Sequence, residues 1–382
     1  MITSLSLINF KPFKYQLLAF RPLTLLSGLN STGKSSVLQA LLLLRQSYQQ
    51  ELLKKTGLAL NGELVNIGTA QDALFEGAGK ADQISFELVL GDGTKGIWSF
   101  NYDQQLDVLN RTSPPVAPEV YESNLFRDNF HYLQAERIGP RTFLEMSDFQ
   151  VRQLGKLGIS GEYAAHFLSV NQDKLIPNSR LSHPNVKLLK RGLDDPEIPS
   201  KFLIDQVEAW MGEISPGTKI RLEPKPDVDL ISVKYFYGDS NLYRATNVGF
   251  GISYTLPIIV AVLASPPGTL ILIENPEAHL HPKGQAKMGE LLALAASCGV
   301  QVVIETHSDH VLNGIRLAVH GGKLNPKDVQ LHYFQRKEKQ GQAFTEVVSP
   351  RIDRNGRIDQ WPDGFFDEWD KSLITLLKPR DA

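Results

Sequence analysis

A single cysteine, Cys298, is present in the 382-residue chain, so no intrachain disulfide can form. Small secreted domains commonly depend on disulfides, and the absence of such a framework favours a reducing compartment. The residues around Cys298 are typical of a helix end, where we expect a buried thiol.

Long apolar runs are also missing. The longest lies near residues 258–264, far short of the ~20 residues that a membrane span needs. Residues 1–5 lack the charged and apolar segments of a secretory signal. We therefore expect a soluble, cytoplasmic protein.

Neither sign of charge dominates, because 40 Lys and Arg residues stand against 42 Asp and Glu residues, for a formal net charge of -2. A protein whose whole body coats nucleic acid is normally basic, so this balance gives no support for that function. A local basic cluster is formed by Arg180, His183, Lys187, Lys190 and Arg191. This basic cluster could contact nucleic-acid phosphates, or it could be an ordinary solvated surface.

What the chain does contain is a glycine loop between a strand and a helix. Residues 28–35 read GLNSTGKS and match G-x-x-x-x-G-K-[ST] at every fixed position. In such a loop the backbone N–H groups cradle phosphates, the lysine reaches the β- and γ-phosphates, and the serine hydroxyl binds Mg²⁺. The apolar stretch 23–26 and the helical pattern 35–46 supply the required context. The residues expected to bind ATP are Asn30, Ser31, Thr32, Gly33, Lys34, Ser35 and Ser36. The alternative is a chance glycine turn before a helix.

A second motif ends in an acidic residue. Residues 270–273 are apolar and of strand length, and Glu274 follows them. This Walker B pattern carries a carboxylate to the edge of a sheet, beside Mg²⁺. Glu274 is the expected Mg²⁺ ligand, through water. The alternative is a buried strand whose terminal carboxylate is satisfied within the fold.

These motifs carry a family resemblance. Residues 274–282, ENPEAHLHP, resemble the Walker B motif of OLD-like ATPases of the SMC/RecF, ABC-type class. They look most similar to an uncharacterised subfamily with a short C-terminal domain of unknown function. Residues 303–308, VIETHS, resemble the family's switch strand, which implies that His307 faces the γ-phosphate. Residues 248–253 resemble the degenerate ABC signature, which implies that Gly251 and Ser253 contact ATP on the other protomer of a homodimer, with Ser253 opening a helix.

The resemblance implies an α/β fold, an ABC-type P-loop domain with an antiparallel β-subdomain and a mostly helical insertion. Four regions follow from the motifs and patterns. They are the first half of the ATPase core (1–110), the helical insertion (111–240), the second half of the core (241–335) and a C-terminal docking segment (336–382). The patterns at 84–90 and 96–102 predict antiparallel strands joined at Gly91, Asp92 and Gly93.

The chain departs from the family at one catalytic position. Asn275 stands where most ABC-type ATPases have the glutamate that polarises water. An amide orients water but accepts no proton, and general base catalysis contributes ~10²–10⁴-fold. Hydrolysis is therefore slow, or Glu277 acts as the base. The alternative for Glu277 is a structural carboxylate in the turn.

Other residues leave two readings open. Gln71 is a Mg²⁺-sensing Q-loop residue or part of a solvated loop, and Asp309 reaches His307 or the dimer interface, or caps a helix. Arg137 is structural or reaches nucleotide across the dimer. The pair His279 and His281, with His307 and His310 nearby, has the spacing of a turn, and we expect no zinc site.

The favoured function is ATP hydrolysis coupled to dimer closure that regulates or assembles a separate effector, such as a nuclease. The family resemblance implies a setting in DNA repair or anti-phage defence. The acidic, aromatic stretch 361–370 is too short for the nuclease domain of full OLD proteins, so we expect it to dock. The alternative function is an ATP-gated scaffold or sensor with little hydrolysis. A GTPase lacks support, because no N-K-x-D motif is present.

Overall fold

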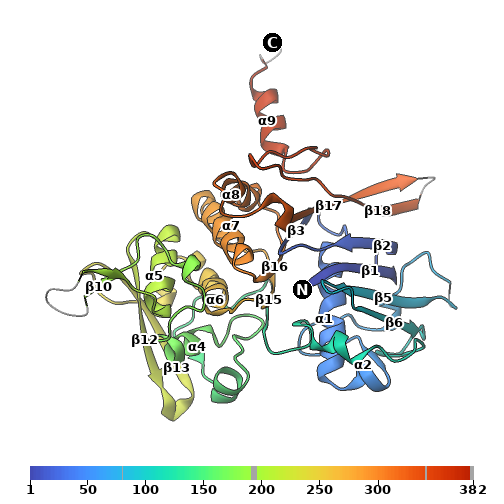
Figure 1. Cartoon of the computed structure of the whole chain (residues 1–382), viewed down its shortest axis with the longest axis horizontal. Helices are drawn as coiled ribbons and strands as arrows, with labels where there is room; N and C mark the ends of the chain where they lie inside the picture. The colour runs from blue at the N-terminus through green and yellow to red at the C-terminus, as the bar shows by residue number, and fades with distance from the viewer. Residues whose placement is uncertain (80, 191–195, 340–341, 379–382) are drawn as a thin grey trace. The chain divides into compact units, whose positions relative to one another are not determined.

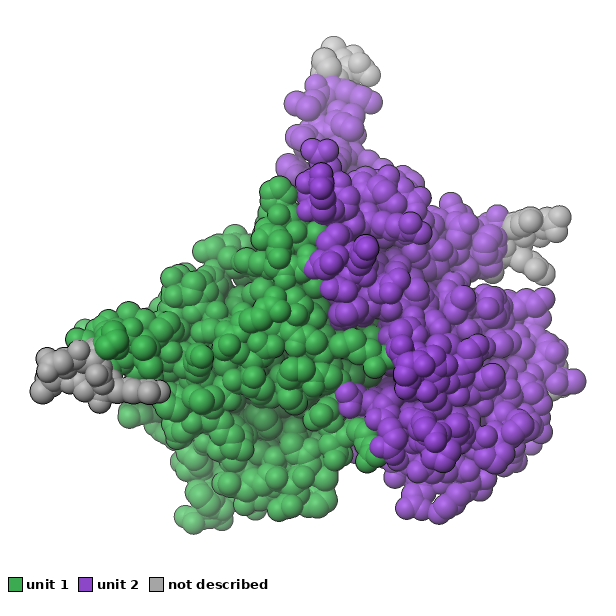
Figure 2. All heavy atoms as spheres, in the orientation of Figure 1, with its two compact units in different colours: residues 1, 127–304, 310–324 green, residues 2–126, 305–309, 325–382 purple. Residues whose placement is uncertain are grey.

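The computed structural model describes residues 1–79, 81–190, 196–339 and 342–378 (Figure 1). They divide into two compact units, coloured separately in Figure 2. Unit 1 comprises Met1, Arg127–Ile304 and His310–Leu324, and unit 2 comprises Ile2–Phe126, Glu305–Asp309 and Asn325–Ala382. Each unit is therefore assembled from separate lengths of chain.

Unit 2 contains an antiparallel sheet in the order β2-β1-β5-β6 (Figure 1). Its strands are β1 (Ile2–Phe10), β2 (Phe13–Ala19), β5 (Gln83–Leu90) and β6 (Lys95–Asn101). In β5, Ile84, Phe86 and Leu88 are buried, which is the alternation expected of a strand with one covered face. The predicted antiparallel pair at 84–90 and 96–102 is confirmed.

Unit 2 also holds the strand that leads to the glycine loop. In this part, β3 (Leu23–Gly28) runs parallel to β17 (Val329–Lys339), and β17 pairs antiparallel with β18 (Gln342–Val348). Helix α1 (Lys34–Gln49) follows the loop and is buried along most of its length. The remaining elements are α2 (Leu52–Lys55), β4 (Gly57–Ala59), α3 (Ala70–Ala73), β7 (Val108–Asn110) and α9 (Glu368–Leu376).

Unit 1 is built around buried, apolar strands, among which β8 (Phe130–Leu133) is parallel to β15 (Leu270–Glu274). Strand β15 also neighbours β16 (Gln301–Glu305), whose last residue belongs to unit 2. The helices are α6 (Phe250–Ala264), α7 (Pro282–Ser297) and α8 (Asp309–His320). Because strands and helices alternate along this stretch, the predicted α/β class is confirmed.

The rest of unit 1 mixes strands with helices. The strands are β9 (Leu144–Glu145), β10 (Leu188–Leu189), β11 (Ile198–Pro199), β12 (Thr218–Lys225), β13 (Leu230–Tyr237) and β14 (Tyr243–Arg244). The helices α4 (Ala164–Asn171) and α5 (Leu203–Ile214) pack against α6. The expected insertion at 111–240 is thus less helical than predicted, because β12 and β13 form a long hairpin and β8 lies beside β15.

Short turns of helix complete the description. A π-helical turn spans Phe149–Gln153, and 3-10 turns span Pro118–Glu122, Ser179–Leu181, Pro226–Val228, Ala245–Asn247 and Pro326–Asp328.

None of the helices in the described ranges combines the length and the apolar character that crossing a membrane requires.

Candidate nucleotide site

The glycine loop of unit 2 adopts a conformation that its glycines permit. Gly28 ends β3 with φ 138°, and Gly33 caps α1 with φ 98°, both in the region that disfavours side chains. A β-carbon at Gly28 would lie 2.1 Å from the backbone oxygen of Phe334, and one at Gly33 would lie 2.8 Å from the ring of Phe13. Both positions therefore require glycine, and the loop leads directly into the N-terminus of α1.

Lys34, the first residue of α1, is only 3% exposed. Its Nζ donates to the carbonyl oxygens of Gly28 (3.0 Å) and Leu29 (2.7 Å). Burial lowers the pKa of the Lys34 ammonium, and the Glu305 carboxylate opposes that shift. The Lys34 ammonium is therefore held at the glycine loop, in a position to bind a phosphate.

Ser35 contacts a carboxylate that the sequence analysis did not select. The Ser35 hydroxyl donates to Oε1 of Glu305 at 2.9 Å, and Glu305 is 6% exposed at the end of β16. One signal could have identified Glu305: like Glu274, it ends a buried apolar strand. A hydroxyl beside a carboxylate is a donor set that suits Mg²⁺, which also takes phosphate oxygens and water.

No group of three or more His, Cys, Asp or Glu side chains that could hold a metal ion is found within the described ranges. A Mg²⁺ ion at Ser35 would take phosphate oxygens of the nucleotide and water as further ligands, as is usual for this ion. The residues at the loop fit that requirement.

The residues after Glu305 remain beside the glycine loop's strand. The N–H of Thr306 donates to the oxygen of Leu26 (3.0 Å), and Thr306 Oγ1 accepts from the N–H of Ser308 (3.0 Å). His307, between them, is exposed, which argues against a buried core histidine. Asp309 is the first residue of α8.

The hairpin of β17 and β18 supports the loop through Thr345. Oγ1 of Thr345 donates to the carbonyl oxygen of Thr32 (3.0 Å), while Thr32 Oγ1 donates to that of Leu29 (2.7 Å). Thr32 and Ser36 are buried, whereas Asn30 and Ser31 are exposed. The two exposed side chains are thus the ones open to a ligand.

Gln71 lies in α3 of the same unit and is exposed. Its Oε1 accepts from Nε2 of Gln104 (3.0 Å), and the neighbouring Thr69 and Asp72 form a capping box. The metal-sensing role of Gln71 remains a prediction. In that role, the Gln71 amide oxygen would have to exchange Gln104 for the metal ion.

The acidic turn, residues 274–282, lies in unit 1. The Glu274 carboxylate accepts from the Tyr132 hydroxyl (2.8 Å) and from the N–H of Ala135 (3.2 Å). Asn275 has φ 45°, a left-handed conformation that asparagine tolerates better than most residues. Glu277 is half-buried in the turn that follows.

Arg137 fastens this turn to its surroundings. The side chain is 2% exposed, and its guanidinium donates to the carbonyl oxygens of Glu274 and Asn275, both at 2.6 Å, and of Tyr254 at 3.1 Å. Burial lowers the pKa of Arg137 to about 10, opposed first by the charge of Glu277. This geometry favours the structural reading of Arg137.

The signature-like segment packs on the acidic turn. Helix α6 begins at Phe250 with Gly249 as its cap, so the prediction that Ser253 opens a helix is wrong by three residues. The Ser253 hydroxyl oxygen is buried. A β-carbon at Gly251 would lie 2.6 Å from the oxygen of His279, so glycine permits this close approach.

Two histidines of the turn have packing and capping roles. The His279 ring lies 4.6 Å from that of Tyr254, and Nδ1 of His281 accepts from the N–H of Lys283 (3.3 Å) at the start of α7. These contacts account for the turn-like spacing of the pair.

The described members of the basic cluster contact carboxylates or carbonyls, and Arg191 lies outside the described residues. The contacts are Lys187–Asp205 (4.0 Å), Lys190–Glu197 (3.6 Å), His183–Glu213 (3.1 Å) and Arg180 to the oxygen of Ser297 (3.2 Å). This neutralisation favours an ordinary solvated surface over a nucleic-acid site. Cys298, nearby, is buried as expected, and burial raises the pKa of its thiol.

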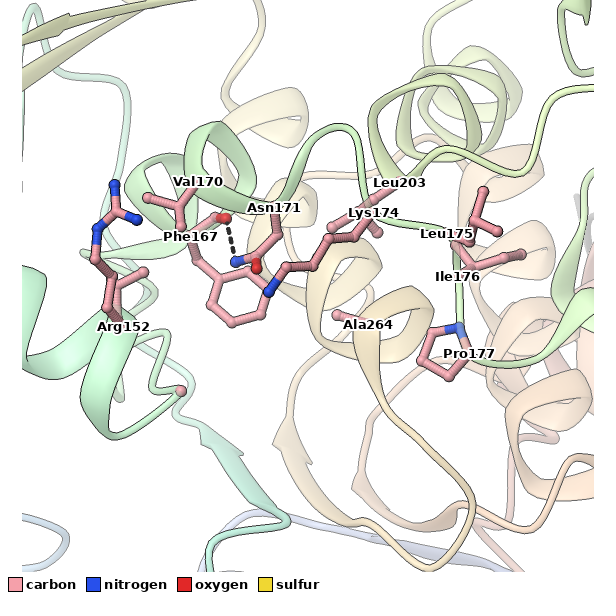
Figure 3. Close-up of a pocket in the computed structure, with 12 residues that line it drawn as sticks. Arg152, Phe167, Val170, Asn171, Lys174, Leu175, Ile176, Pro177, Leu203 and Ala264 are labelled. Atoms are coloured by element: carbon pink, nitrogen blue, oxygen red, sulfur yellow. Dashed lines mark hydrogen bonds between the residues drawn. The ribbon is translucent and has the colours of Figure 1, made fainter.

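Unit 1 also contains a pocket of about 470 Å³ (Figure 3). Its walls include Phe167, Lys174 and Leu203, and Nδ2 of Asn171 donates to the oxygen of Phe167 at 2.8 Å. The residues that line this pocket belong to none of the nucleotide motifs, so we do not assign the pocket to the nucleotide site.

The acidic, aromatic segment docks on β17 within unit 2. Phe365 is fully buried, with its ring 5.3 Å from that of Tyr333, and the Tyr333 hydroxyl donates to the oxygen of Asp363 (3.0 Å). In α9, which follows, Trp369 is exposed. Docking of this segment on a partner remains a prediction.

Three family models match parts of the chain. Residues 1–89 match "AAA ATPase domain", residues 160–313 match "AAA domain, putative AbiEii toxin, Type IV TA system", and residues 324–376 match "Protein of unknown function (DUF3696)". No curated protein sequence gives a significant match. The segment with the glycine loop and the segment with the acidic turn are thus each similar to an AAA-type ATPase domain.

Solved structures of SMC head domains are similar in outline. An Smc head bound to the C-terminal winged-helix domain of ScpA has a TM-score of 0.49 at 13% identity, covering 91% of this chain and 98% of its own. The SMC head domain from Thermotoga maritima has a TM-score of 0.45 at 14% identity, with the same coverage. An Smc head with an extended coiled coil, bound to a ScpA domain derived from Pyrococcus furiosus, has a TM-score of 0.43 at 12% identity and covers 99% of both chains. Scores below 0.5 assign no property to this chain.

Proposed function

We propose that this protein binds ATP with Mg²⁺ at the glycine loop of unit 2, hydrolyses it, and uses the cycle to close a homodimer. The observation that supports this most strongly is the arrangement of Lys34 and Ser35. The lysine charge spans the loop, and the serine hydroxyl faces a carboxylate. This is the chemistry that a triphosphate and its cation require.

The glycine loop supplies binding. Lys34 exchanges its two carbonyl partners for phosphate oxygens, the backbone N–H groups of residues 30–34 surround the phosphates, and the α1 N-terminus favours their charge. Ser35 and Glu274 hold the cation, with Gln71 sensing it. When bound, Mg²⁺ neutralises charge on the phosphates.

The acidic turn supplies two catalytic groups, because Asn275 orients the attacking water and Glu277 accepts its proton. Arg137 fixes the backbone of the turn on which these two side chains depend. His307 of unit 2, which is exposed, donates a hydrogen bond to the γ-phosphate.

Dimer closure places Gly251, Ser253 and the start of α6 against the nucleotide of the other protomer. The buried position of the Ser253 hydroxyl means that this contact needs a rearrangement in the first turns of α6. Asp309, two residues after His307 in sequence, contributes to the same interface.

The closed dimer regulates or assembles a separate effector, such as a nuclease, in the cytoplasm, in a DNA repair or anti-phage defence pathway. The match of residues 160–313 to a model whose description refers to a toxin–antitoxin system supports a defence setting.

A second candidate function is an ATP-gated scaffold that scarcely hydrolyses ATP. Asn275 favours it, because an amide accepts no proton and its backbone is fixed by Arg137. In this case, ATP binding alone closes the dimer and presents a surface to the effector.

The experiment compares ATP binding, phosphate release and dimerisation for the full chain, Lys34→Ala and Lys14→Ala. Lys14 is an exposed lysine of β2 and serves as the matched control. If turnover and ATP-dependent dimers disappear in Lys34→Ala but persist in Lys14→Ala, the result supports the ATPase. Tight binding with negligible turnover supports the scaffold, and absence of binding by the unmodified chain contradicts both.

A further inference from the structure

Glu305 is the carboxylate that the structure places on the glycine loop. It comes 270 residues after Ser35, and the two side chains meet at 2.9 Å, with the serine hydroxyl donating. Glu305 is almost fully buried, and its backbone ends β16 directly before Thr306, which bonds to β3. The carboxylate is therefore held at the loop by the strand, and not by a flexible segment.

The field of this carboxylate reaches the groups that would bind phosphate. Glu305 raises the pKa of Lys34 against the larger effect of burial, so the two charges interact. A triphosphate brings several negative charges to the same loop, and like charges repel strongly when water is excluded from around them. A divalent cation held by Ser35 and Glu305 would offset these negative charges.

Glu274 is differently placed. Both of its carboxylate oxygens accept hydrogen bonds from Tyr132 and Ala135 of unit 1, so its charge is partly satisfied within that unit. Glu305, in contrast, is bonded to the residue expected to ligate the cation. The charge of Glu305 is therefore the one that would interact most directly with a cation or a phosphate at the loop.

We propose that Glu305 is a positioning residue that makes ATP binding conditional on a divalent cation. Without the cation, the carboxylate repels the phosphates and retains the Ser35 hydroxyl. With the cation, the carboxylate stabilises the bound complex and releases Ser35 to the metal. This inference rests on the proposed binding of ATP at the loop, and it adds a requirement that the glycine-loop motif alone does not specify.

The test measures the affinity of a fluorescent ATP analogue for the full chain, in EDTA and in Mg²⁺. Glu305→Gln removes the charge but keeps an oxygen that can accept from Ser35. We expect this variant to bind the analogue in EDTA about 10-fold more tightly than the unmodified chain, and to gain about 3-fold or less from Mg²⁺. Glu87→Gln, in β5 of the same unit, removes an equal charge away from the loop and should change neither value.

Two further measurements separate a charge effect from a structural one. Glu305→Asp keeps the charge but retracts it, so it should retain the weak binding in EDTA. Mn²⁺ electron paramagnetic resonance, with the ATP analogue present, should show weaker Mn²⁺ binding in Glu305→Gln, and thermal unfolding should confirm that each variant is folded.

An unchanged ratio of the EDTA and Mg²⁺ affinities in folded Glu305→Gln would overturn this inference while leaving the proposed function intact. If Glu305→Gln fails to fold, Glu305→Asp decides the question: tight binding in EDTA despite its charge would overturn the inference, and weak binding there with strong recovery in Mg²⁺ would support it. Absence of binding by the unmodified chain in both conditions would overturn both proposals.

Discussion

The glycine loop of unit 2 and the acidic turn of unit 1 achieve their shapes by opposite means. The loop is shaped by backbone conformation, with Gly28 and Gly33 at positive φ, and Lys34 bridges it through two carbonyls. The turn is shaped by one buried side chain, Arg137, which donates to carbonyls from three segments of unit 1.

This difference indicates where each region tolerates change. A loop built from backbone groups is sensitive to an added β-carbon, whereas its exposed side chains, Asn30 and Ser31, are open to a ligand. A turn held by a guanidinium is sensitive to loss of that one residue, because several buried carbonyls would lose their donor together. Substitutions in each region test this difference.

Glu277→Gln should reduce ATP turnover about 10²–10⁴-fold if Glu277 is the base, because the amide cannot accept a proton from water. ATP affinity should stay unchanged, since the glycine loop supplies binding. Phosphate release and nucleotide titration measure the two effects. Glu136→Gln, at an exposed neighbour of Arg137, is the control. Turnover that survives in Glu277→Gln would assign Glu277 a structural role in the turn.

Arg137→Ala should lower the free energy of unfolding by about 3–5 kcal/mol, because it leaves buried carbonyl oxygens without their donor. Urea denaturation measures the loss. Arg141→Ala, at an exposed arginine four residues away, should change the stability by less than about 0.5 kcal/mol. Equal stabilities for the two variants would mean that the turn does not depend on Arg137.

Gly33→Ala should weaken ATP binding by about 1–3 kcal/mol, through strain at φ 98° and collision with Phe13. Gly93→Ala provides a matched control, because Gly93 has φ 86° but no atom within 4 Å of the added carbon. Nucleotide titration of both variants separates an effect specific to the glycine loop from a general effect of an added carbon at positive φ. If Gly93→Ala weakens ATP binding equally, the glycine loop has no special requirement at Gly33.

Thr345→Val should have the smallest effect, about 0.5–1.5 kcal/mol in ATP affinity, because it removes one hydrogen bond to the loop from β18. Thr112→Val removes a comparable side-chain bond, from Thr112 to the oxygen of Ser99, elsewhere in unit 2. A titration in which both variants match the unmodified chain would show that the hairpin does not brace the loop.

The sequence predicted features whose causes are local. The spacing of Gly28, Gly33, Lys34 and Ser35 specifies a loop conformation that needs few distant contacts. The same holds for the antiparallel pair of β5 and β6.

Features that depend on distant partners escaped prediction. The Ser35–Glu305 contact joins residues 270 positions apart, and although an apolar strand pattern ends at Glu305, that pattern does not reveal that the two side chains meet. Strand β8 was assigned to an insertion because four residues containing His131 give too weak a pattern to indicate a buried strand.

The discontinuous make-up of unit 2 has a consequence for protein synthesis. Glu305–Asp309 belongs to this unit although the residues on either side of it belong to unit 1. At about 5–20 residues per second, a ribosome adds Glu305 tens of seconds after Ser35. Every nascent chain before that moment carries the whole glycine loop without its carboxylate, so the site's ionic balance is set only after the strand that ends at Glu305 has been synthesised.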